Sequence, residues 1–381
     1  MLFPRCRPGP VRGVPAYLLV LIFFIAAVYP SFFLYRHYDD YVYKPEIRPL
    51  STQQDVEQVF TPTEQEMACL QGKPFPPDGR HRFGLSLASK SDPIPSIVHF
   101  IFLQRLPLAE DGQGDFDFLN YLSVRSALMS LKPKKIILHY AYTSSDPSLL
   151  ESLKGDPLID NNKWIKRLKP HLEFDKITSA LDNHLVHAAH LADTLRLEII
   201  LSQGGIYLDT DVFILRPFTK LLASPSPHDL VLGHEGGNRW GLCNAIIAAR
   251  PNSTFVRRWL DTYKGADLNQ EWNYHSVLLP KEMSGKHPDE ICTLPPDAFF
   301  WPTWTDDHVR WMHEKIERTE ARHWENKIWR TGGSLFDNQL AYHAWNHVSK
   351  DGYLERLTPQ VMREEDTRFN LLMRRFLEAD L

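Results

Sequence analysis

The chain has 381 residues, enough for one large domain or for two smaller ones. Its hydrophobic content of 43% and charged content of 24% are typical of a globular protein. The net charge of −4 gives no sign of a nucleic-acid partner, so we expect none.

An uncharged apolar segment lies near the N-terminus, between residues 14 and 35. As a helix, 22 residues span about 33 Å, which matches a bilayer core of about 30 Å. Three arginines in residues 1–13 precede it, so the positive-inside rule predicts a cytosolic tail, a single-pass type II anchor and a luminal remainder. A cleaved signal peptide is the alternative, although its apolar region normally has only about 7–15 residues.

The cysteines agree with a lumen that permits disulfides. Cys6 would be cytosolic, which leaves Cys69, Cys243 and Cys292 on the other side of the membrane. An odd number leaves at least one thiol unpaired, and the sequence does not decide which pair forms. Cys243 lies in an apolar run and is predicted to be buried and inert. Asn252 begins an N-glycosylation sequon, which fits the secretory pathway.

The first part of the chain beyond the anchor changes from irregular to regular sequence. Residues 36–93 are rich in proline and polar residues and predict a stem or linker, with a short helix near 52–67. Regular elements then follow, which we predict as a strand at 94–103, a helix at 118–133 and a strand at 134–142. Strand, helix and strand in this order begin a parallel α/β sheet, so we expect one α/β domain over 94–381.

The middle of that domain carries the clearest pattern. A helix over 182–205 ends at two glycines, and a short strand at 206–208 follows at once. Further elements are predicted as strands at 212–215, 230–235, 242–250 and 341–346, a helix at 253–264, and mostly helix over 359–379.

Two aspartates, Asp209 and Asp211, stand at the C-terminal end of the strand at 206–208. A chain of this composition contains about two Asp-x-Asp triplets by chance. A second does occur at Asp115 and Asp117, in a polar stretch that we interpret as a solvated loop. The first triplet differs because it follows a buried strand, at the edge where α/β folds bind ligands.

Two carboxylates this close repel each other unless positive charge lies beside them. Carboxylate oxygens suit Mg²⁺ or Mn²⁺, which in turn hold phosphate oxygens. A metal site at Asp209 and Asp211 is therefore one interpretation, and a pair of capping residues in a turn is the other.

The preceding helix adds two charged residues. Asp193 and Arg196 lie three positions apart, so they share one face of the helix. A surface ion pair of little energetic value is the simplest interpretation. The helix is mostly apolar around them, however, and its end leads straight to Asp209. A carboxylate and a guanidinium on one crevice can hold the hydroxyls and the phosphate of a sugar phosphate.

The stretch LADTLRLEIILSQGGIYLDTDVFILRPF resembles the core of the DXD-containing glycosyltransferases. That group includes fungal α-1,6-mannosyltransferases, α-1,4-galactosyltransferases and, more distantly, the glucosylating domains of clostridial toxins. The pattern A-D-x-x-R, followed by G-G-x-Y-x-D-x-D, is matched in spacing and identity. The similarity extends over residues 94–350 and implies a GT-A fold, a Rossmann-like nucleotide-sugar-binding fold, with retention of anomeric configuration.

The resemblance also implies roles for particular residues. Asp211 and Asp209 would ligate the metal, and Asp209 would also touch the donor ribose. His343 would be a late metal ligand, with His347 in reserve. The metal would be Mn²⁺ or Mg²⁺.

Other positions would bind the nucleotide-sugar donor, a UDP-hexose or GDP-mannose. Asp193 and Arg196 would hold the donor sugar and, with Asp211, form the catalytic set. Tyr207 and Asn244 would complete the donor site.

The function implied is a metal-dependent, retaining hexosyltransferase that is a single-pass Golgi membrane protein with a luminal catalytic domain. Its product would carry galactose or mannose on a glycan or glycolipid acceptor. Contact with that acceptor is one interpretation of Trp272, Tyr274 and His275, and packing is the other. A catalytically inactive GT-A-fold protein that binds a glycan or a partner is the alternative. A metal-dependent phosphohydrolase would need additional ligands at short spacing, which the sequence lacks.

Overall fold

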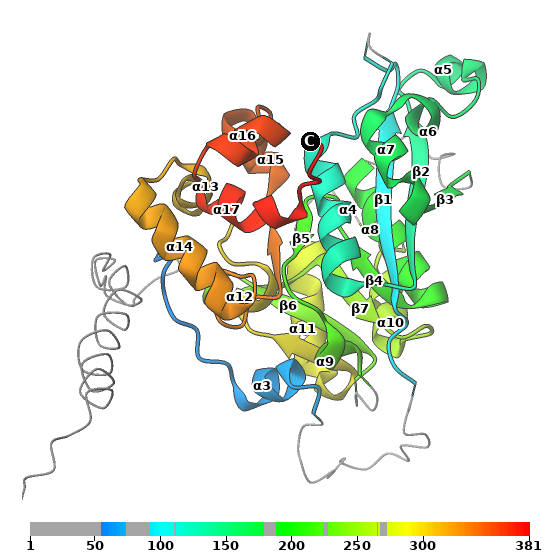
Figure 1. Ribbon diagram of the computed structural model, residues 1–381. Helices are drawn as coiled ribbons and strands as arrows, with labels where there is room; N and C mark the ends of the chain where they lie inside the picture. Colours follow the sequence, from blue (N-terminus) through cyan, green and yellow to red (C-terminus); the bar gives the residue numbers. More distant parts are fainter. Residues whose placement is uncertain are drawn as a thin grey trace, which may run out of the picture.

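A computed structural model gives the fold of the protein (Figure 1). The structure describes residues 55–73, 92–109, 112–178, 188–223, 228–264, 266 and 273–381. The predicted anchor at 14–35 and most of the predicted stem lie outside these residues. Among the residues described, no helix has the length and apolar character needed to cross a bilayer.

A seven-stranded mixed sheet lies at the centre, in the order β3-β2-β1-β4-β7-β6-β8. Its strands are β1 (Ile97–Arg105), β2 (Lys135–Thr143), β3 (Glu173–Lys176), β4 (Gly205–Leu208), β6 (Leu230–Glu235), β7 (Gly241–Ala249) and β8 (Ile291–Leu294). β7 runs antiparallel to both β4 and β6, so β4 and β6 point the same way. Their C-terminal ends therefore lie at the same edge of the sheet, and the predicted α/β class is confirmed.

Helices cover both faces of this sheet (Figure 1). On one face, Tyr207 of β4 packs in a cluster with residues of α8 (Ala188–Gln203) and α10 (Thr254–Thr262). Ile206 and Leu208 belong to the cluster on the opposite face, with α4 (Phe118–Leu131) and α7 (Lys163–Leu168). Alternate residues of a strand point to opposite faces, so a strand covered on both sides is apolar throughout, as β4 is.

A helical region packs beside a second, two-stranded sheet made of β5 (Val212–Ile214) and β9 (Ala341–His343). Its helices are α13 (Asp306–His313), α14 (Arg318–Thr331), α15 (Asn346–Ser349), α16 (Pro359–Glu364) and α17 (Arg368–Met373), orange to red in Figure 1. The remaining helices are α3 (Glu64–Leu70), α5 (Pro147–Ser152), α6 (Pro157–Asn161), α9 (Thr219–Leu222), α11 (Leu279–Lys286) and α12 (Pro296–Phe299). This second sheet brings the C-terminal third of the chain against the residues that follow β4.

Residues 55–73, inside the stretch predicted as a stem, lie against the α/β domain. Cys69 of α3 forms a disulfide with Cys292 of β8, which answers the pairing question left open by the sequence. Glu66 is buried and forms an ion pair with Arg239, whose Nε lies 2.7 Å from Glu66 Oε1. Cys243 is a buried free thiol, as predicted. The segment is therefore joined to the domain by a covalent bond and a buried charge pair.

Most predicted elements are confirmed, and the differences have local causes. The helix expected near 52–67 begins only at Glu64, because Thr63 and Glu66 form a capping box there. The strand predicted at 341–346 ends at His343, since Trp345 has a left-handed φ of 53° and caps α15. The solvated-loop interpretation of the second Asp-x-Asp triplet was incomplete, because Asp117 is the N-cap of α4.

Candidate active site

A pocket of about 590 Å³ opens at the edge of the sheet where β4 and β6 end. Its lining includes every residue predicted for the metal and donor sites: Asp193, Arg196, Tyr207, Asp209, Asp211, Asn244 and His343. They come from α8, β4, the turn after β4, β7 and β9, so the pocket unites five separate parts of the chain.

The backbone around β4 places the Asp-x-Asp triplet at the pocket. Gly204 and Gly205 have φ values of 64° and 106°, which let the chain turn from α8 into β4. A Cβ atom on Gly205 would lie 2.5 Å from the Ile97 carbonyl oxygen, so the tight approach of β4 to β1 needs glycine. At the other end of β4, the Val212 amide donates to the Asp209 carbonyl over 3.1 Å and closes the turn that presents both carboxylates.

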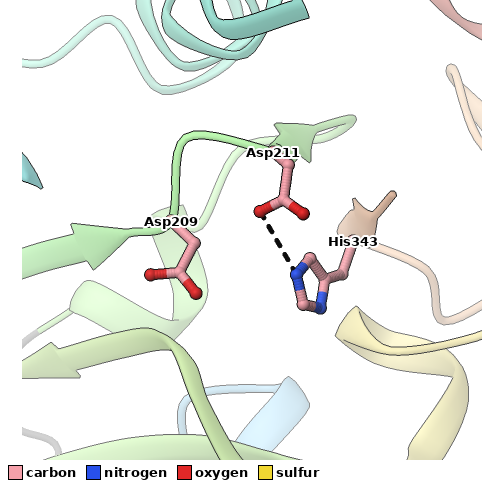
Figure 2. Close-up of side chains that lie close together, drawn as sticks. All are labelled: Asp209, Asp211 and His343. Atoms are coloured by element: carbon pink, nitrogen blue, oxygen red, sulfur yellow. Dashed lines mark ion pairs between the residues drawn. The ribbon is translucent and has the colours of Figure 1, made fainter. Parts of the chain in front are cut away.

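The pairing of β5 with β9 brings a histidine to this turn. In the antiparallel register Val212 lies opposite His343, so the side chain of His343 arrives beside Asp211. Nε2 of His343 lies 3.2 Å from Oδ1 of Asp211 (Figure 2). The Asn346 amide donates to the other oxygen of Asp211 over 2.9 Å. His343 and Asn346, which lie more than 130 positions after Asp211 in the chain, thus fix the carboxylate of Asp211.

Asp209, Asp211 and His343 could hold a metal ion. One ligand atom from each lies within 4.8 Å of the others, and the three side chains point toward a common space (Figure 2). Ligands at about 2.1 Å from an octahedral ion are about 3 Å apart when adjacent and about 4 Å apart when opposite. Two carboxylates and one imidazole are donors that Mn²⁺ accepts, and Mg²⁺ suits the carboxylates. The residues present therefore fit the divalent ion expected from the sequence.

The two aspartates differ electrostatically. Burial alone would raise the pKa of Asp211, but the charge and hydrogen bond of His343 and the Asn346 amide outweigh burial and bring the pKa to about 2. Burial raises the pKa of Asp209, and Asp211 adds to this effect, while the Arg196 guanidinium opposes it. Asp211 is thus an anion with dedicated partners, and Asp209 depends on Arg196 for its negative charge.

Arg196 is the charged centre of the part of the pocket lined by Asp193, Tyr207 and Asn244. Its Nη1 lies 3.0 Å from Oδ1 of Asp209, and its Nη2 lies 3.3 Å from Oδ1 of Asp193. The guanidinium also covers the ring of Tyr207, at 4.7 Å from the ring centre. Burial would lower the pKa of Arg196, but the surrounding carboxylates raise it, so the guanidinium stays charged.

Hydrogen bonds fix the neighbours of Arg196. Tyr207 donates its hydroxyl to Oδ1 of Asp209 over 2.6 Å. The Asn244 side chain donates to Oδ1 of Asp193 over 2.8 Å and accepts from Arg196 Nη1 over 3.0 Å. A network whose members are mutually bonded holds its geometry before any ligand arrives.

Several other lining residues were not identified from the sequence. Glu235 and Trp304 line the pocket, and so does Asn346, whose amide holds Asp211. Glu235 is the last residue of the predicted strand at 230–235, and Asp209 directly follows the predicted strand at 206–208. This similar position could have identified Glu235 as a candidate. Trp304 lies in no regular element and offered none.

The acceptor candidates are only partly placed. Tyr274 and His275 are not among the residues that line the pocket, whereas their neighbours Asn273 and Ser276 are. Trp272 lies outside the described residues. His347 lines the pocket but is not part of the three-residue ligand cluster found there.

Comparisons with known proteins found a family model and a relative that match this chain. Residues 124–227 match the family model for the glycosyltransferase sugar-binding region containing a DXD motif. The glucan organizing enzyme 1 of Cryptococcus neoformans var. grubii is 35% identical over 297 residues, which cover 74% of this chain and 71% of that protein.

Two more distant similarities were also found. The lactosylceramide 4-alpha-galactosyltransferase of Rattus norvegicus is 25% identical over 194 residues, covering 47% of each chain. Among solved structures, the glycosyltransferase GlyE of Streptococcus pneumoniae has a TM-score of 0.40 and 10% identity, covering 74% of this chain and 60% of that one.

Proposed function

The chain belongs to the glycosyltransferases whose sugar-binding region contains a DXD motif, and from this premise we propose that it is a metal-dependent, retaining hexosyltransferase. The donor is a nucleotide sugar, a UDP-hexose or GDP-mannose, and the sugar moved is galactose or mannose. The acceptor is a glycan or a glycolipid. The observation that carries the proposal is the single pocket in which Asp209, Asp211 and His343 meet Asp193 and Arg196.

The donor sugar lies on the Arg196 side of the pocket. Asp193 and Asn244 are held by Arg196 and line the pocket, and a carboxylate and a carboxamide are groups that hydrogen-bond sugar hydroxyls. Because their mutual bonds already fix these groups, little conformational entropy is lost when the sugar binds.

Charge determines the rest of the chemistry. Cleavage of the bond between sugar and diphosphate leaves new negative charge on the diphosphate. A Mn²⁺ or Mg²⁺ ion held by Asp209, Asp211 and His343 would supply Lewis-acid stabilisation of that leaving group. Arg196 adds a fixed positive charge within the same pocket, and the buried site strengthens its effect.

Retention follows from attack on the same face of the sugar that the diphosphate leaves. Such an attack requires the acceptor hydroxyl to approach beside the leaving group, through an oxocarbenium-like state. The metal-ligand cluster and the residues assigned to the donor line one pocket, which supports this route.

The proposed location is the Golgi membrane, with the catalytic domain in the lumen. The apolar residues 14–35 and the basic tail before them support a type II anchor. Asn252 is exposed in the turn before α10, so its sequon is accessible to glycosylation. The disulfide between Cys69 and Cys292 also fits an oxidising compartment.

Donor binding tests the proposal directly. Thermal unfolding of the full-length chain in detergent is measured with UDP-galactose, UDP-glucose or GDP-mannose, with Mn²⁺ or with a chelator. A donor at 100 times its Kd stabilises the folded state by about 2.7 kcal/mol. We expect one donor to raise Tm only with metal present, and Asp211→Asn to lose that shift. No shift with any donor, from a chain that unfolds cooperatively, would favour the non-catalytic alternative.

A further inference from the structure

Glu235 is a buried carboxylate that the metal and donor groups do not use. It is the last residue of β6, it is 4% exposed, and it lines the same pocket as the Asp-x-Asp triplet. It is not part of the ligand cluster of Asp209, Asp211 and His343. Within the described part of the chain, no Lys or Arg forms an ion pair with it. A buried anion without a cation costs free energy unless hydrogen-bond donors reach it.

One such donor comes from an aromatic side chain at the mouth of the pocket. Nε1 of Trp304 donates to Oε1 of Glu235 over 3.0 Å. Trp304 is 42% exposed although its indole N–H is engaged, and it too lines the pocket. A carboxylate beside a partly exposed indole suits a sugar, which offers hydroxyl donors on its rim and C–H groups on its faces.

The chain segment that carries Trp304 is firmly held. The Gln339 side chain donates to the Trp301 carbonyl over 2.8 Å, and Trp345 Nε1 donates to the Pro302 carbonyl over 3.0 Å. The Thr303 amide donates to His308 Nδ1 over 3.0 Å. A ring fixed in this way loses little freedom when a ligand stacks on it.

The turn that follows Glu235 is also anchored. Arg239 in that turn is paired with the buried Glu66 of α3. Glu235 and Trp304 are therefore both placed by packing and not by a ligand.

Their position separates them from the donor residues. In the sheet, β7 lies between β4 and β6, and strands are about 4.8 Å apart, so the ends of β4 and β6 are about 10 Å apart across the sheet. That separation leaves room for a further sugar ring beside the donor sugar. Because an acceptor glycan continues into solvent, its reacting unit must enter at an exposed rim such as Trp304.

We propose that Trp304 and Glu235 form the subsite for the acceptor sugar: a pyranose ring stacks on the Trp304 indole and one of its hydroxyls donates to the Glu235 carboxylate. This inference rests on the proposed transferase function, and it assigns acceptor specificity to two residues outside the Asp-x-Asp motif. Both are assigned to substrate binding, and neither belongs to the ligand cluster of Asp209, Asp211 and His343.

Kinetics of the full-length chain separate donor from acceptor effects. The variants are Glu235→Gln and Trp304→Ala, with Trp329→Ala as the matched control, because Trp329 is 72% exposed on α14 and does not line the pocket. We expect Glu235→Gln to raise the acceptor KM about 10- to 100-fold, since hydrogen bonds to charged groups are of that strength. Trp304→Ala removes the stacking surface and should raise the acceptor KM up to about 10-fold. Donor KM, donor hydrolysis without acceptor, and the control variant should change less than about threefold. An unchanged acceptor KM in both test variants would overturn the proposal.

A binding measurement decides the question even without turnover. Tryptophan fluorescence of the full-length chain is titrated with lactose and with the methyl glycosides of galactose, glucose, mannose and N-acetylglucosamine. A sugar-dependent change that persists in Trp329→Phe and is lost in Trp304→Phe supports the subsite. A change that survives in Trp304→Phe, or no change with any of these sugars, contradicts it.

The two proposals can fail separately. If donors stabilise the chain but no sugar binds at Trp304, the acceptor-subsite proposal is wrong and the transferase proposal stands. If sugars bind at Trp304 but no donor stabilises the chain, the non-catalytic glycan-binding alternative is favoured.

Discussion

The chain contains two Asp-x-Asp triplets, and they have different roles in the structure. Asp117 accepts a hydrogen bond from the Asn120 amide and caps α4, while the Asn120 side chain bonds back to the Asp117 amide. Asp115 accepts from the side chain of Gln104 over 3.2 Å. In the other triplet, Asp209 meets Arg196 and Asp211 meets His343. The same short pattern is thus a helix cap in one place and a charged pocket in the other.

The difference arises from what the rest of the chain brings to each triplet. Asp115 and Asp117 are bonded to residues within about a dozen positions of themselves. The triplet after β4 receives β9, α8 and β7, which supply a histidine, an arginine and an asparagine. The two triplets are also linked by a hydrogen bond, since the side-chain amide of Asn120 donates to the Thr210 carbonyl over 3.2 Å. We infer that convergence of distant residues distinguishes a functional motif from a chance one, and the following predictions test that distinction.

Replacing one aspartate of each triplet by asparagine should give the largest difference in activity between the triplets. We expect Asp211→Asn to lower kcat/KM for sugar transfer by about 1,000-fold, because metal-assisted stabilisation of a leaving group contributes several kcal/mol. Asp117→Asn is the matched control, since Asn caps a helix about as well as Asp. Transfer to any accepting glycan, measured with labelled donor, provides the comparison. Equal activity of the two variants would show that the triplets do not differ in function.

Arg196 should matter for folding as well as for activity. Arg196→Ala leaves Asp193 and Asp209 without their shared cation, and loss of one partner from a buried ion pair costs about 3–5 kcal/mol. Urea unfolding measures the change in free energy. Arg318→Ala, which removes the contacts of an exposed guanidinium with Glu325 and Asp366, should leave stability almost unchanged. A small change in the free energy of unfolding for Arg196→Ala would mean that water solvates the carboxylates of Asp193 and Asp209 well enough without the guanidinium.

Acid should weaken the strand that leads to Asp209 and Asp211. His99 of β1 donates from Nε2 to the Gly204 carbonyl, just before β4, over 2.9 Å. Burial, and next the charge of His139, lower the pKa of His99 to about 4, from 6.5. The unfolded chain therefore binds more protons between these two values. Neutral His99 makes its full contribution to the free energy of unfolding above pH 6.5, and this contribution is lost as the pH falls toward 4.

The difference between the two pKa values of His99 corresponds to about 3 kcal/mol of unfolding free energy. Urea unfolding at pH 7.5 and at pH 4.5 measures this loss. His99→Gln should lose less stability on acidification than the native chain. An equal loss in both proteins would assign the acid sensitivity to other groups, such as His139, whose pKa burial also lowers.

The smallest expected effect belongs to the capping triplet. Asp117→Ala removes the side-chain acceptor of the Asn120 amide and should cost about 1 kcal/mol. Urea unfolding detects this change, and Asp117→Ser, which keeps a capping oxygen, should restore most of the stability. A loss as large as that of Arg196→Ala would mean that Asp117 does more than cap α4.

The sequence predicted the parts of the site that are close together in the chain. The apolar run of β4, the two glycines before it and the aspartates after it follow local rules of strand and turn formation. The helix pair of Asp193 and Arg196 was found because helical spacing relates residues three positions apart.

The parts that depend on tertiary register were harder to predict. His343 was expected from a family resemblance, whereas its contact with Asp211 depends on the antiparallel pairing of Val212 with His343. Trp304 lies in an irregular segment whose position is set by Gln339 and Trp345, so no local pattern marks it. Glu235 could have been found, because β6 is parallel to β4 and a charged residue at a strand end deserves the same interpretation.

Manganese binding tests the central claim, that convergence makes Asp209 and Asp211 the functional triplet. Electron paramagnetic resonance counts the free Mn²⁺ left after titration of the full-length chain in detergent, in the presence of UDP or GDP. We predict about one bound ion per chain for the native protein and for Asp117→Asn, and none for Asp211→Asn. Binding that is equal in all three proteins, or absent from all three, would contradict the account.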